Sequence, residues 1–244
     1  MTSIDPEVLE KLRQYDTPTV LNVIELFEVR PRQEGFLNGE IKACFPEMGP
    51  IVGYASTATF QRATEPAEGD AYSNLADQVG VFDEELPAPR IVVFEDIDPE
   101  PCGATFGEVM CTVYQNFGCA GLITSGGGRD LEQVRALGFP VFTGGTICSH
   151  GYGQWLHVGL PVRVGGLIVE TGNLLHADAN GVTNIPLEIA SEIVDVAPEY
   201  IAAEELVIGY NKAPGEKNIA ELVERAVACK AAIAEIQRRV SRAK

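Results

Sequence analysis

Two adjacent residues of opposite charge, Arg129 and Asp130, follow three consecutive glycines in the stretch GLITSGGGRD. Glycine can adopt positive φ and lets the main chain approach a ligand closely. An arginine can grip a carboxylate with its forked donors, and an aspartate can hold a hard divalent cation. Two structural roles compete with this interpretation. Arg129 could be a plain exposed charge, and Asp130 could cap the following helix, with Gln133 three residues on.

A second glycine-containing loop, CGATFGEVMC, also leads into a predicted helix. The N-terminus of a helix presents unpaired backbone N–H groups and a partial positive charge, which favour an anion. A carboxylate could therefore rest on the amides of residues 107–110. Glu108 could join Asp130 as an oxygen ligand of a divalent cation.

Several common glycine motifs are excluded. No lysine follows the glycines as a phosphate-binding P-loop requires, and Leu131 stands where a dinucleotide fingerprint needs its third glycine. Ser125 lacks the first glycine of a GxSxG nucleophile elbow. The sequence therefore gives little support to a nucleotide or S-adenosylmethionine fold.

The elements that must position these loops alternate between strand and helix patterns. Apolar and β-branched runs predict strands at 51–60, 91–94, 120–124 and 140–143. Helical spacing or capping signals predict helices at 6–14, 18–28, 70–79, 106–117 and 130–137. Such alternation is typical of βαβ units in a parallel sheet, and the two glycine loops would open at one edge of that sheet.

The C-terminal third shows a different sequence pattern. From Gly159 to Pro186, short β runs cut by GG, TGN and NG predict a β meander, which would add a β layer. The tail carries a 3-4-3-4 apolar seam, which predicts a long helix packed either on its own domain or on another subunit. We expect one α/β domain over 1–244, layered α/β/β/α, with a mixed, largely parallel sheet. Its core would cover about 15–197 and its helical extension 198–244. The seam consists of Ile219, Leu222, Ala226, Cys229, Ile233, Ile236 and Val240.

Composition narrows the function classes. The 244 residues carry a net charge of −17, which disfavours binding to nucleic acid or to an anionic membrane surface. The six cysteines form no zinc-type cluster and are expected to be reduced. No secretory signal or membrane-length apolar run is visible, so a cytoplasmic location is expected.

The stretch GEVMCTVYQNFGCAGLITSGGGRDLEQVRALGFPVF, with VGGLIVETGNLLHADANGVTNIP, resembles the RraA-like family. That family includes 4-hydroxy-4-methyl-2-oxoglutarate aldolases with oxaloacetate decarboxylase side activity. It also includes the regulator of ribonuclease activity A and members labelled demethylmenaquinone methyltransferase. The resemblance runs from about 53 to 197. Its most specific element is GxxRD (Gly126, Arg129, Asp130) followed by PVF at 140–142, and the segment DxxGV at 178–182 supports it.

The resemblance implies a divalent-metal-dependent aldolase that works at trimer interfaces, often as a dimer of trimers, with Mg²⁺ or Mn²⁺. Arg129 matches the arginine that contacts the bound keto acid, and Asp130 matches the metal-anchoring aspartate. Gly107, Val109 and Met110 match the loop whose amides receive the pyruvate carboxylate, with Glu108 as an acidic group near the metal. Two positions depart from the family pattern: Ser125 replaces an aspartate, and Gly172-Asn173 stands where the family has PGD.

Retro-aldol cleavage and β-decarboxylation of a 2-keto acid both generate pyruvate enolate, which a divalent cation and Arg129 would stabilise. The leading hypothesis is therefore a metal-dependent carbon–carbon lyase. A non-catalytic protein-binding regulator of the ribonuclease-inhibitor type is the alternative, and a methyltransferase is disfavoured. For the remaining candidate residues, structural roles are favoured. We expect packing or surface positions for His150, His157 and His176. Asp178 is expected to stabilise a turn, and core packing is favoured over pocket lining for Tyr152 and Trp155.

Overall fold

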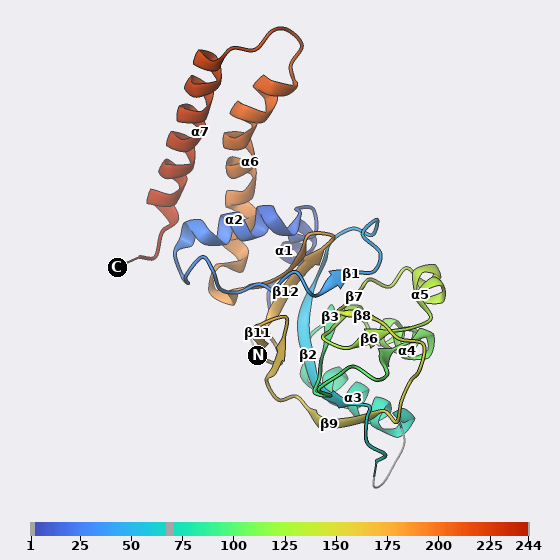
Figure 1. Cartoon of the computed structure of the whole chain (residues 1–244). Coiled ribbons are helices and arrows are strands. Elements are labelled where there is room, and N and C mark those ends of the chain that lie inside the picture. The colour runs from blue at the N-terminus through green and yellow to red at the C-terminus, as the bar shows by residue number, and fades with distance from the viewer. Residues whose placement is uncertain (1–2, 67–70, 244) are drawn as a thin grey trace.

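A computed structural model describes residues 3–66 and 71–243, with the side chains of 71–74 left out. Its centre is a mixed sheet of eight strands in the order β1-β7-β5-β3-β2-β12-β13, with β9 paired to β2 (Figure 1). The strands of this sheet are β1 (Lys42–Ala43), β2 (Ile51–Gln61), β3 (Arg90–Asp96), β5 (Cys119–Thr124), β7 (Val141–Thr143), β9 (Gln154–Val158), β12 (Leu174–Asp178) and β13 (Gly181–Ile185).

Four neighbouring strands, β2, β3, β5 and β7, run parallel, as the alternation of patterns predicts. The crossovers between them are α3 (Ala71–Glu85), α4 (Glu108–Asn116) and α5 (Leu131–Leu137). Asp70, the predicted start of α3, lies outside the described residues. Because each crossover returns the chain to the same end of the sheet, the segments after β2, β3 and β5 meet at one edge.

Alternation along the strands divides the core. On β2, Val52, Tyr54 and Phe60 face helices, whereas Ile51 and Ala55 face the opposite side of the sheet. The opposite side is covered by β10 (Val162–Val164) and β11 (Leu167–Val169), which form a separate two-stranded sheet. The predicted extra β layer is therefore this small hairpin, because β12 and β13 join the main sheet as antiparallel strands instead of lying over it.

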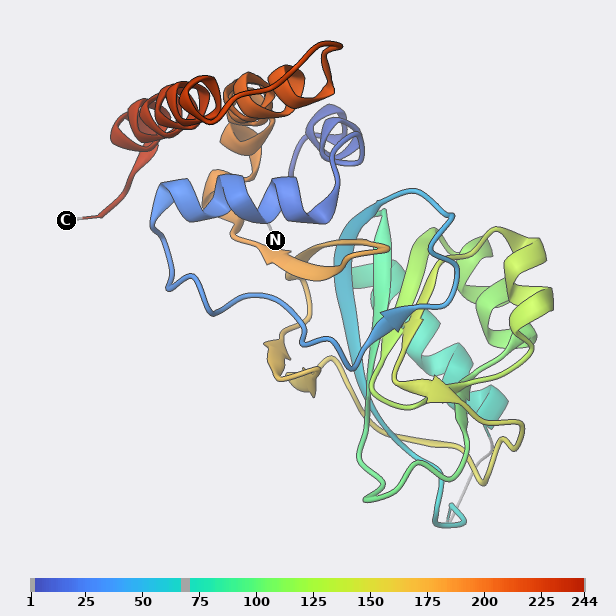
Figure 2. The same ribbon diagram turned by 45° about the horizontal axis from the view of Figure 1, so that its top comes forward.

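Helices from the two ends of the chain lie together. Figure 2 shows α1 (Pro6–Leu12) and α2 (Thr17–Phe27) between the sheet and the C-terminal helices, and α2 contacts α6, β12 and β13. A short 3₁₀ turn, η1 (Leu187–Ile189), leads into α6 (Ala190–Lys212), which pairs with α7 (Ile219–Val240). The C-terminal extension is thus a hairpin of two long helices rather than one, and the predicted boundary at 198 falls inside α6.

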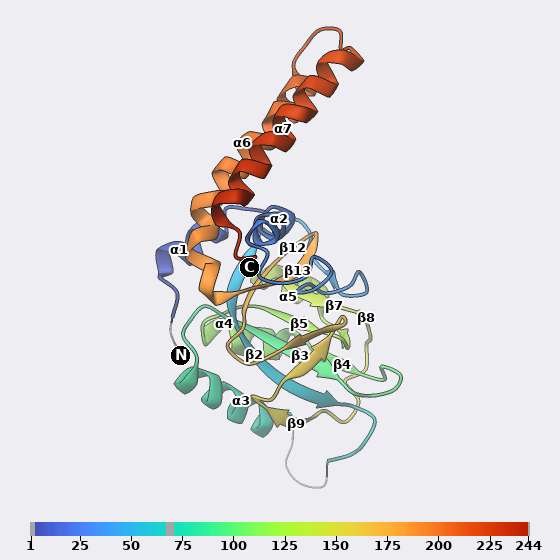
Figure 3. The same ribbon diagram turned by 90° about the vertical axis from the view of Figure 1, so that its left-hand side faces the viewer.

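The α6–α7 hairpin projects away from the sheet (Figure 3). The predicted seam of α7 is buried on its own chain only at the C-terminal end, where Ile236 and Val240 are 5% and 6% exposed. At the far end, Ile219 is 75% exposed. Packing on the same domain therefore buries two of the seven seam residues. Among the helices that the structure describes, none combines the length and apolarity needed to span a bilayer.

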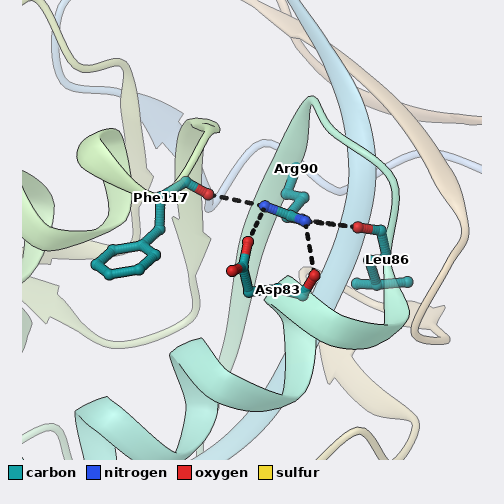
Figure 4. Close-up of polar contacts among 4 residues, drawn as sticks. All are labelled: Asp83, Leu86, Arg90 and Phe117. Atoms are coloured by element: carbon teal, nitrogen blue, oxygen red, sulfur yellow. Dashed lines mark hydrogen bonds and ion pairs between the residues drawn. The ribbon is translucent and has the colours of Figure 1, made fainter.

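A buried arginine ties the helical layer to the sheet. Arg90, at the start of β3, donates to the carbonyls of Leu86 (2.9 and 2.7 Å), Phe117 (2.9 Å) and Asp83 (3.3 Å), and pairs with the Asp83 carboxylate at 3.1 Å (Figure 4). These contacts join the end of α3, the end of α4 and the first residue of β3. The guanidinium is thus buried with its donors used, which is the usual condition for a structural arginine.

His176 on β12 is fully buried beneath the N-terminal helices. Its Nε2 donates to the Leu12 carbonyl (3.1 Å), and its Nδ1 accepts from the Thr17 hydroxyl (2.9 Å), which is the pattern of a neutral ring. Burial lowers the pKa of His176. The packing role expected for this histidine is confirmed.

The pH dependence of stability should carry the signature of His176. Because the unfolded histidine binds a proton below pH about 6.5 and the folded one resists it, the free energy of unfolding should fall as pH drops below that value, by at most ~1.4 kcal/mol per pH unit. Urea melts of the protein and of His176→Gln between about pH 5 and 7.5 measure this. Identical slopes for the two proteins would contradict it.

Candidate active site

A second small sheet at the carboxyl edge positions the glycine loop. Its parallel strands β4 (Ala104–Phe106), β6 (Gly127–Gly128) and β8 (Gly145–Thr146) follow β3, β5 and β7. The expectation of positive φ in the glycine run is wrong, since none of residues 126–128 has positive φ and the left-handed residue is Asp130. Glycine is required for close approach instead: a Cβ on Gly128 would collide with the Phe106 ring.

The carboxylate of Asp130 faces the neighbouring loop and not its own helix. Asp130 takes left-handed φ and ψ (54° and 37°), and its side chain makes no capping hydrogen bond to α5. Its Oδ2 instead accepts from the backbone N–H of Glu108 (3.1 Å) and lies 3.7 Å from Nε of Arg129. The capping alternative for Asp130 is therefore wrong, because the left-handed backbone turns the carboxylate across the loop.

One cavity of about 560 Å³ brings most of the predicted residues together. Gly107, Val109, Met110, Arg129 and Asp130 all line it. Side chains of the last two are about one third exposed, 35% and 37%. A small anion in this cavity would therefore lie near the Arg129 guanidinium, the Asp130 carboxylate and the N-terminus of α4.

Glu108 contributes differently from its prediction. Its side chain is exposed and is not part of the cavity lining, whereas its backbone N–H holds the Asp130 carboxylate. The structure thus gives Glu108 a place in the site through its main chain. Its predicted role as an acidic group near a metal remains a prediction.

The cavity is also lined by residues for which the sequence favoured other roles or gave no signal. His150, Tyr152 and Trp155 line the cavity. For the two aromatic residues, the sequence had favoured core packing over this role. Trp155 is fixed by a hydrogen bond from its Nε1 to Gln78 (2.8 Å) and by edge contact with Phe60. Arg62, directly after β2, also lines the cavity. These residues reach the glycine loop through the pairing of β9 with β2 and not through any local motif.

The donor set fits a weakly held hard cation. Among the residues that the structure describes, no three side chains of His, Cys, Asp or Glu gather around one point. Asp130 offers a partly exposed carboxylate at the cavity wall. Mg²⁺ keeps several waters and commonly binds through one or two carboxylates plus oxygens of the substrate. A single aspartate facing an open cavity is compatible with that mode.

The positions that depart from the family pattern have local structural roles. The Ser125 hydroxyl accepts from the backbone N–H of Asp96 (2.9 Å). The Asn173 side chain accepts from the N–H of Glu170 (3.0 Å) and from the Asn184 amide (3.1 Å). Asp178 accepts from the Thr17 N–H at the start of α2 (2.9 Å) and from the Asn180 N–H in the turn between β12 and β13 (2.7 Å). The turn-stabilising role predicted for Asp178 is therefore confirmed.

Gly107 gives a steric test of the site. Its backbone is extended (φ −158°), so any residue can adopt it, but an added Cβ would lie 2.6 Å from Oδ2 of Asp130 and 3.2 Å from Nε of Arg129. Gly107→Ala should therefore displace the charged pair with little loss of stability. A displacement of about 1 Å at a reacting centre costs on the order of 10²-fold in turnover. Steady-state kinetics and a thermal melt measure both effects.

Gly145→Ala is the matched control for this substitution. Gly145 lies in the same small sheet, and a Cβ there meets nothing within 4 Å. We expect its activity to stay within about twofold of the parent protein. Equal activity in the two alanine variants would contradict the placement of the Arg129–Asp130 pair.

Comparison with known proteins identifies the family of this chain. Residues 17–183 match the RraA-like family, described as Aldolase/RraA. A protein of Halalkalibacterium halodurans provisionally named 4-hydroxy-4-methyl-2-oxoglutarate aldolase is 29% identical over 126 residues, which cover 51% of this chain and 57% of that protein. The chain therefore spans little more than half the length of this relative.

Solved structures share the fold at low identity. An uncharacterised protein from Pseudomonas syringae superposes with a TM-score of 0.71 at 20% identity, over 93% of this chain and 95% of that one. Streptomyces coelicolor RraAS2, described as an unusual member of the RNase ES inhibitor RraA protein family, gives 0.66 at 23%, over 84% and 97%. With well over half of its length matched by the family and the same fold in these structures, the chain belongs to the RraA-like family.

Proposed function

We propose that the protein is a divalent-metal-dependent lyase that cleaves a carbon–carbon bond of a 2-keto acid by retro-aldol cleavage or β-decarboxylation. The observation that carries this proposal is the orientation of Asp130. Its carboxylate leaves its own helix and faces, with Arg129, a cavity floored by the N-terminus of α4. A carboxylate used only to cap its own helix, α5, would turn away from this cavity.

The residues of the cavity have distinct roles in this proposal. The amides of Gly107, Val109 and Met110, together with the dipole of α4, receive the carboxylate of the keto acid, since the Glu108 N–H is already bound to Asp130. Arg129 donates to the oxygen on which negative charge develops as the enolate forms, and such a preorganised donor lowers the barrier. Asp130 holds Mg²⁺ or Mn²⁺, which when bound supplies Lewis-acid stabilisation of that same charge.

His150, another residue of the cavity lining, supplies an acceptor for a proton. Its Nδ1 donates to the Gly151 carbonyl (2.6 Å), since a carbonyl can only accept. The neutral ring then leaves Nε2 with a lone pair. In retro-aldol cleavage, the hydroxyl of the substrate must lose a proton, and in this proposal His150, which lines the cavity, takes it at this nitrogen.

A homo-oligomer, as a trimer or a dimer of trimers, belongs to the proposal. The support is the family to which the chain belongs. Light scattering of the purified protein tests it, and a monomer at micromolar concentration would contradict it.

Pyruvate release tests the proposed reaction. The purified protein would be incubated with oxaloacetate and with branched 4-hydroxy-2-keto acids, and pyruvate measured with coupled lactate dehydrogenase. We expect release that is abolished by EDTA and restored by Mg²⁺ or Mn²⁺. No release from any of these acids with either metal would favour the protein-binding regulator, the alternative function found within the same family.

A further inference from the structure

Arg62 is a second guanidinium on the wall of the same cavity. It follows the last residue of β2, is 4% exposed, and lines the cavity with Arg129. Among residues 3–66 and 71–243, its Nε has no hydrogen-bond partner, and neither has Oδ2 of Asp96 or Oδ1 of Asp98, the two carboxylates whose charges act on it. A buried donor without a hydrogen-bond partner carries a desolvation cost, so its presence calls for a reason.

The two buried arginines of this fold differ in how their donors are used. Arg90, 7% exposed, gives its donors to three carbonyls and to the Asp83 carboxylate (Figure 4). Arg62 lies beside the cavity with Nε unused. Arg90 is thus explained by the fold alone, whereas Arg62 is not.

Aromatic packing fixes the guanidinium of Arg62 in place. Its Cζ lies 4.0 Å from the centroid of the Phe60 ring, and Phe60 is held in turn by Trp155, whose ring centroid is 4.4 Å away. Stacking on an aromatic face orients an arginine without using its hydrogen-bond donors. Nε is itself shielded from solvent, so a ligand in the cavity would bind the terminal nitrogens of Arg62.

The acidic residues near Arg62 do not neutralise it fully. Asp98 directs its Oδ2 to the backbone N–H groups of Arg62 (2.6 Å) and Ala63 (3.0 Å), and Asp96 accepts from the N–H of Asp98 (3.1 Å). Burial lowers the pKa of Arg62 to about 10, Asp96 opposes this, and Arg129 adds to it. Arg62 is thus still cationic at neutral pH and close enough to Arg129 to be influenced by its charge.

We infer that Arg62 is a specificity-determining residue that binds a second carboxylate of the substrate, distal to the keto acid group held at Arg129. The inference rests on the proposed function, because it needs the keto acid end to sit at Arg129. A cavity of about 560 Å³ leaves room beyond a three-carbon acid. Glu65, on the exposed rim, is screened by solvent and does not prevent this binding.

Two stable acids of equal length test the inference by binding alone. 2-Oxoglutarate and 2-oxopentanoate share a five-carbon chain and differ in a terminal carboxylate against a methyl group. Their dissociation constants would be measured by calorimetry with Mg²⁺ for the parent protein, Arg62→Met and Arg135→Met. Arg135 is the matched control, since it stacks on Phe45 (5.1 Å) outside the cavity.

We expect Arg62→Met to weaken 2-oxoglutarate binding roughly 10- to 100-fold, the effect of a lost charge-assisted hydrogen bond, and to leave 2-oxopentanoate within about twofold. Arg135→Met should change neither. The thermal midpoint of Arg62→Met should fall, because Asp96 and Asp98 lose a nearby cation. Should Arg62→Met not fold, Arg62→Lys carries the test, with a smaller selective loss.

The outcomes separate this inference from the proposed function. Equal loss for both acids, or no loss for either, would overturn the role of Arg62 even if the parent protein releases pyruvate. A selective loss in a protein that releases no pyruvate would uphold Arg62 and overturn the lyase. Binding of neither acid by the parent protein would overturn the role of Arg62, whereas the lyase would still be decided by pyruvate release.

Discussion

Arg129→Ala is expected to lower pyruvate release by on the order of 10²–10³-fold while the protein remains folded. The reason is that the guanidinium would be the donor aimed at the developing enolate charge. Its removal should not unfold the loop, because the contact that holds Arg129 in the small sheet is its backbone N–H to the Phe106 carbonyl (3.2 Å). The measurement is kcat/KM with coupled lactate dehydrogenase, together with a thermal melt.

Arg135→Ala is the control for the loss of one arginine. Arg135 lies one turn into α5, is 56% exposed, and pairs with Glu47 on the surface. Its replacement should leave kcat/KM within about twofold, since exposed ion pairs contribute little. Arg129→Lys should recover part of the lost activity, because the charge returns without the forked donor. An Arg129→Ala protein as active as the parent would remove Arg129 from the reaction.

Asp130→Asn is expected to lower metal-dependent turnover by on the order of 10²-fold or more, since the amide cannot supply the anionic oxygen that a hard cation needs. Asparagine suits this position because it tolerates the left-handed backbone of Asp130 (φ 54°). The loss should appear with unchanged stability. Titration of activity with Mg²⁺ should also show a weaker apparent affinity, if any activity persists.

Asp130→Ala separates backbone strain from chemistry. Alanine at a left-handed position costs roughly 1–2 kcal/mol, so this variant should be less stable than Asp130→Asn while both lose activity. Full Mg²⁺-dependent activity in Asp130→Asn would contradict the assignment of Asp130 to the metal.

The sequence was sufficient to predict the parallel core of the sheet and part of the cavity lining. Strand and helix patterns predicted the βαβ core, and GxxRD drew attention to Arg129 and Asp130, which both line the cavity. These features are local, because periodicity and loop composition are carried by consecutive residues. The same local reasoning could not decide between capping and ligand binding for Asp130, since the answer depends on its φ and on the amide of Glu108, 22 residues away.

The rest of the cavity lining was not predictable from the sequence for a related reason. Arg62 and Trp155 reach the cavity through pairing of β9 with β2, which joins Phe60 to Trp155 across more than 90 residues of chain. No motif marks such a contact in advance. The glycine run was misinterpreted in the same way, because the need for glycine comes from the Phe106 ring on a neighbouring strand and not from the dihedral angles of a turn.

The most direct test of the account is a crystal structure of the protein with Mg²⁺ and pyruvate. We expect the metal beside the Asp130 carboxylate, the pyruvate carboxylate on the amides at the start of α4, and the keto oxygen within hydrogen-bonding distance of Arg129. Metal and pyruvate bound together elsewhere in the molecule, with no ligand density beside Arg129 and Asp130, would contradict the account.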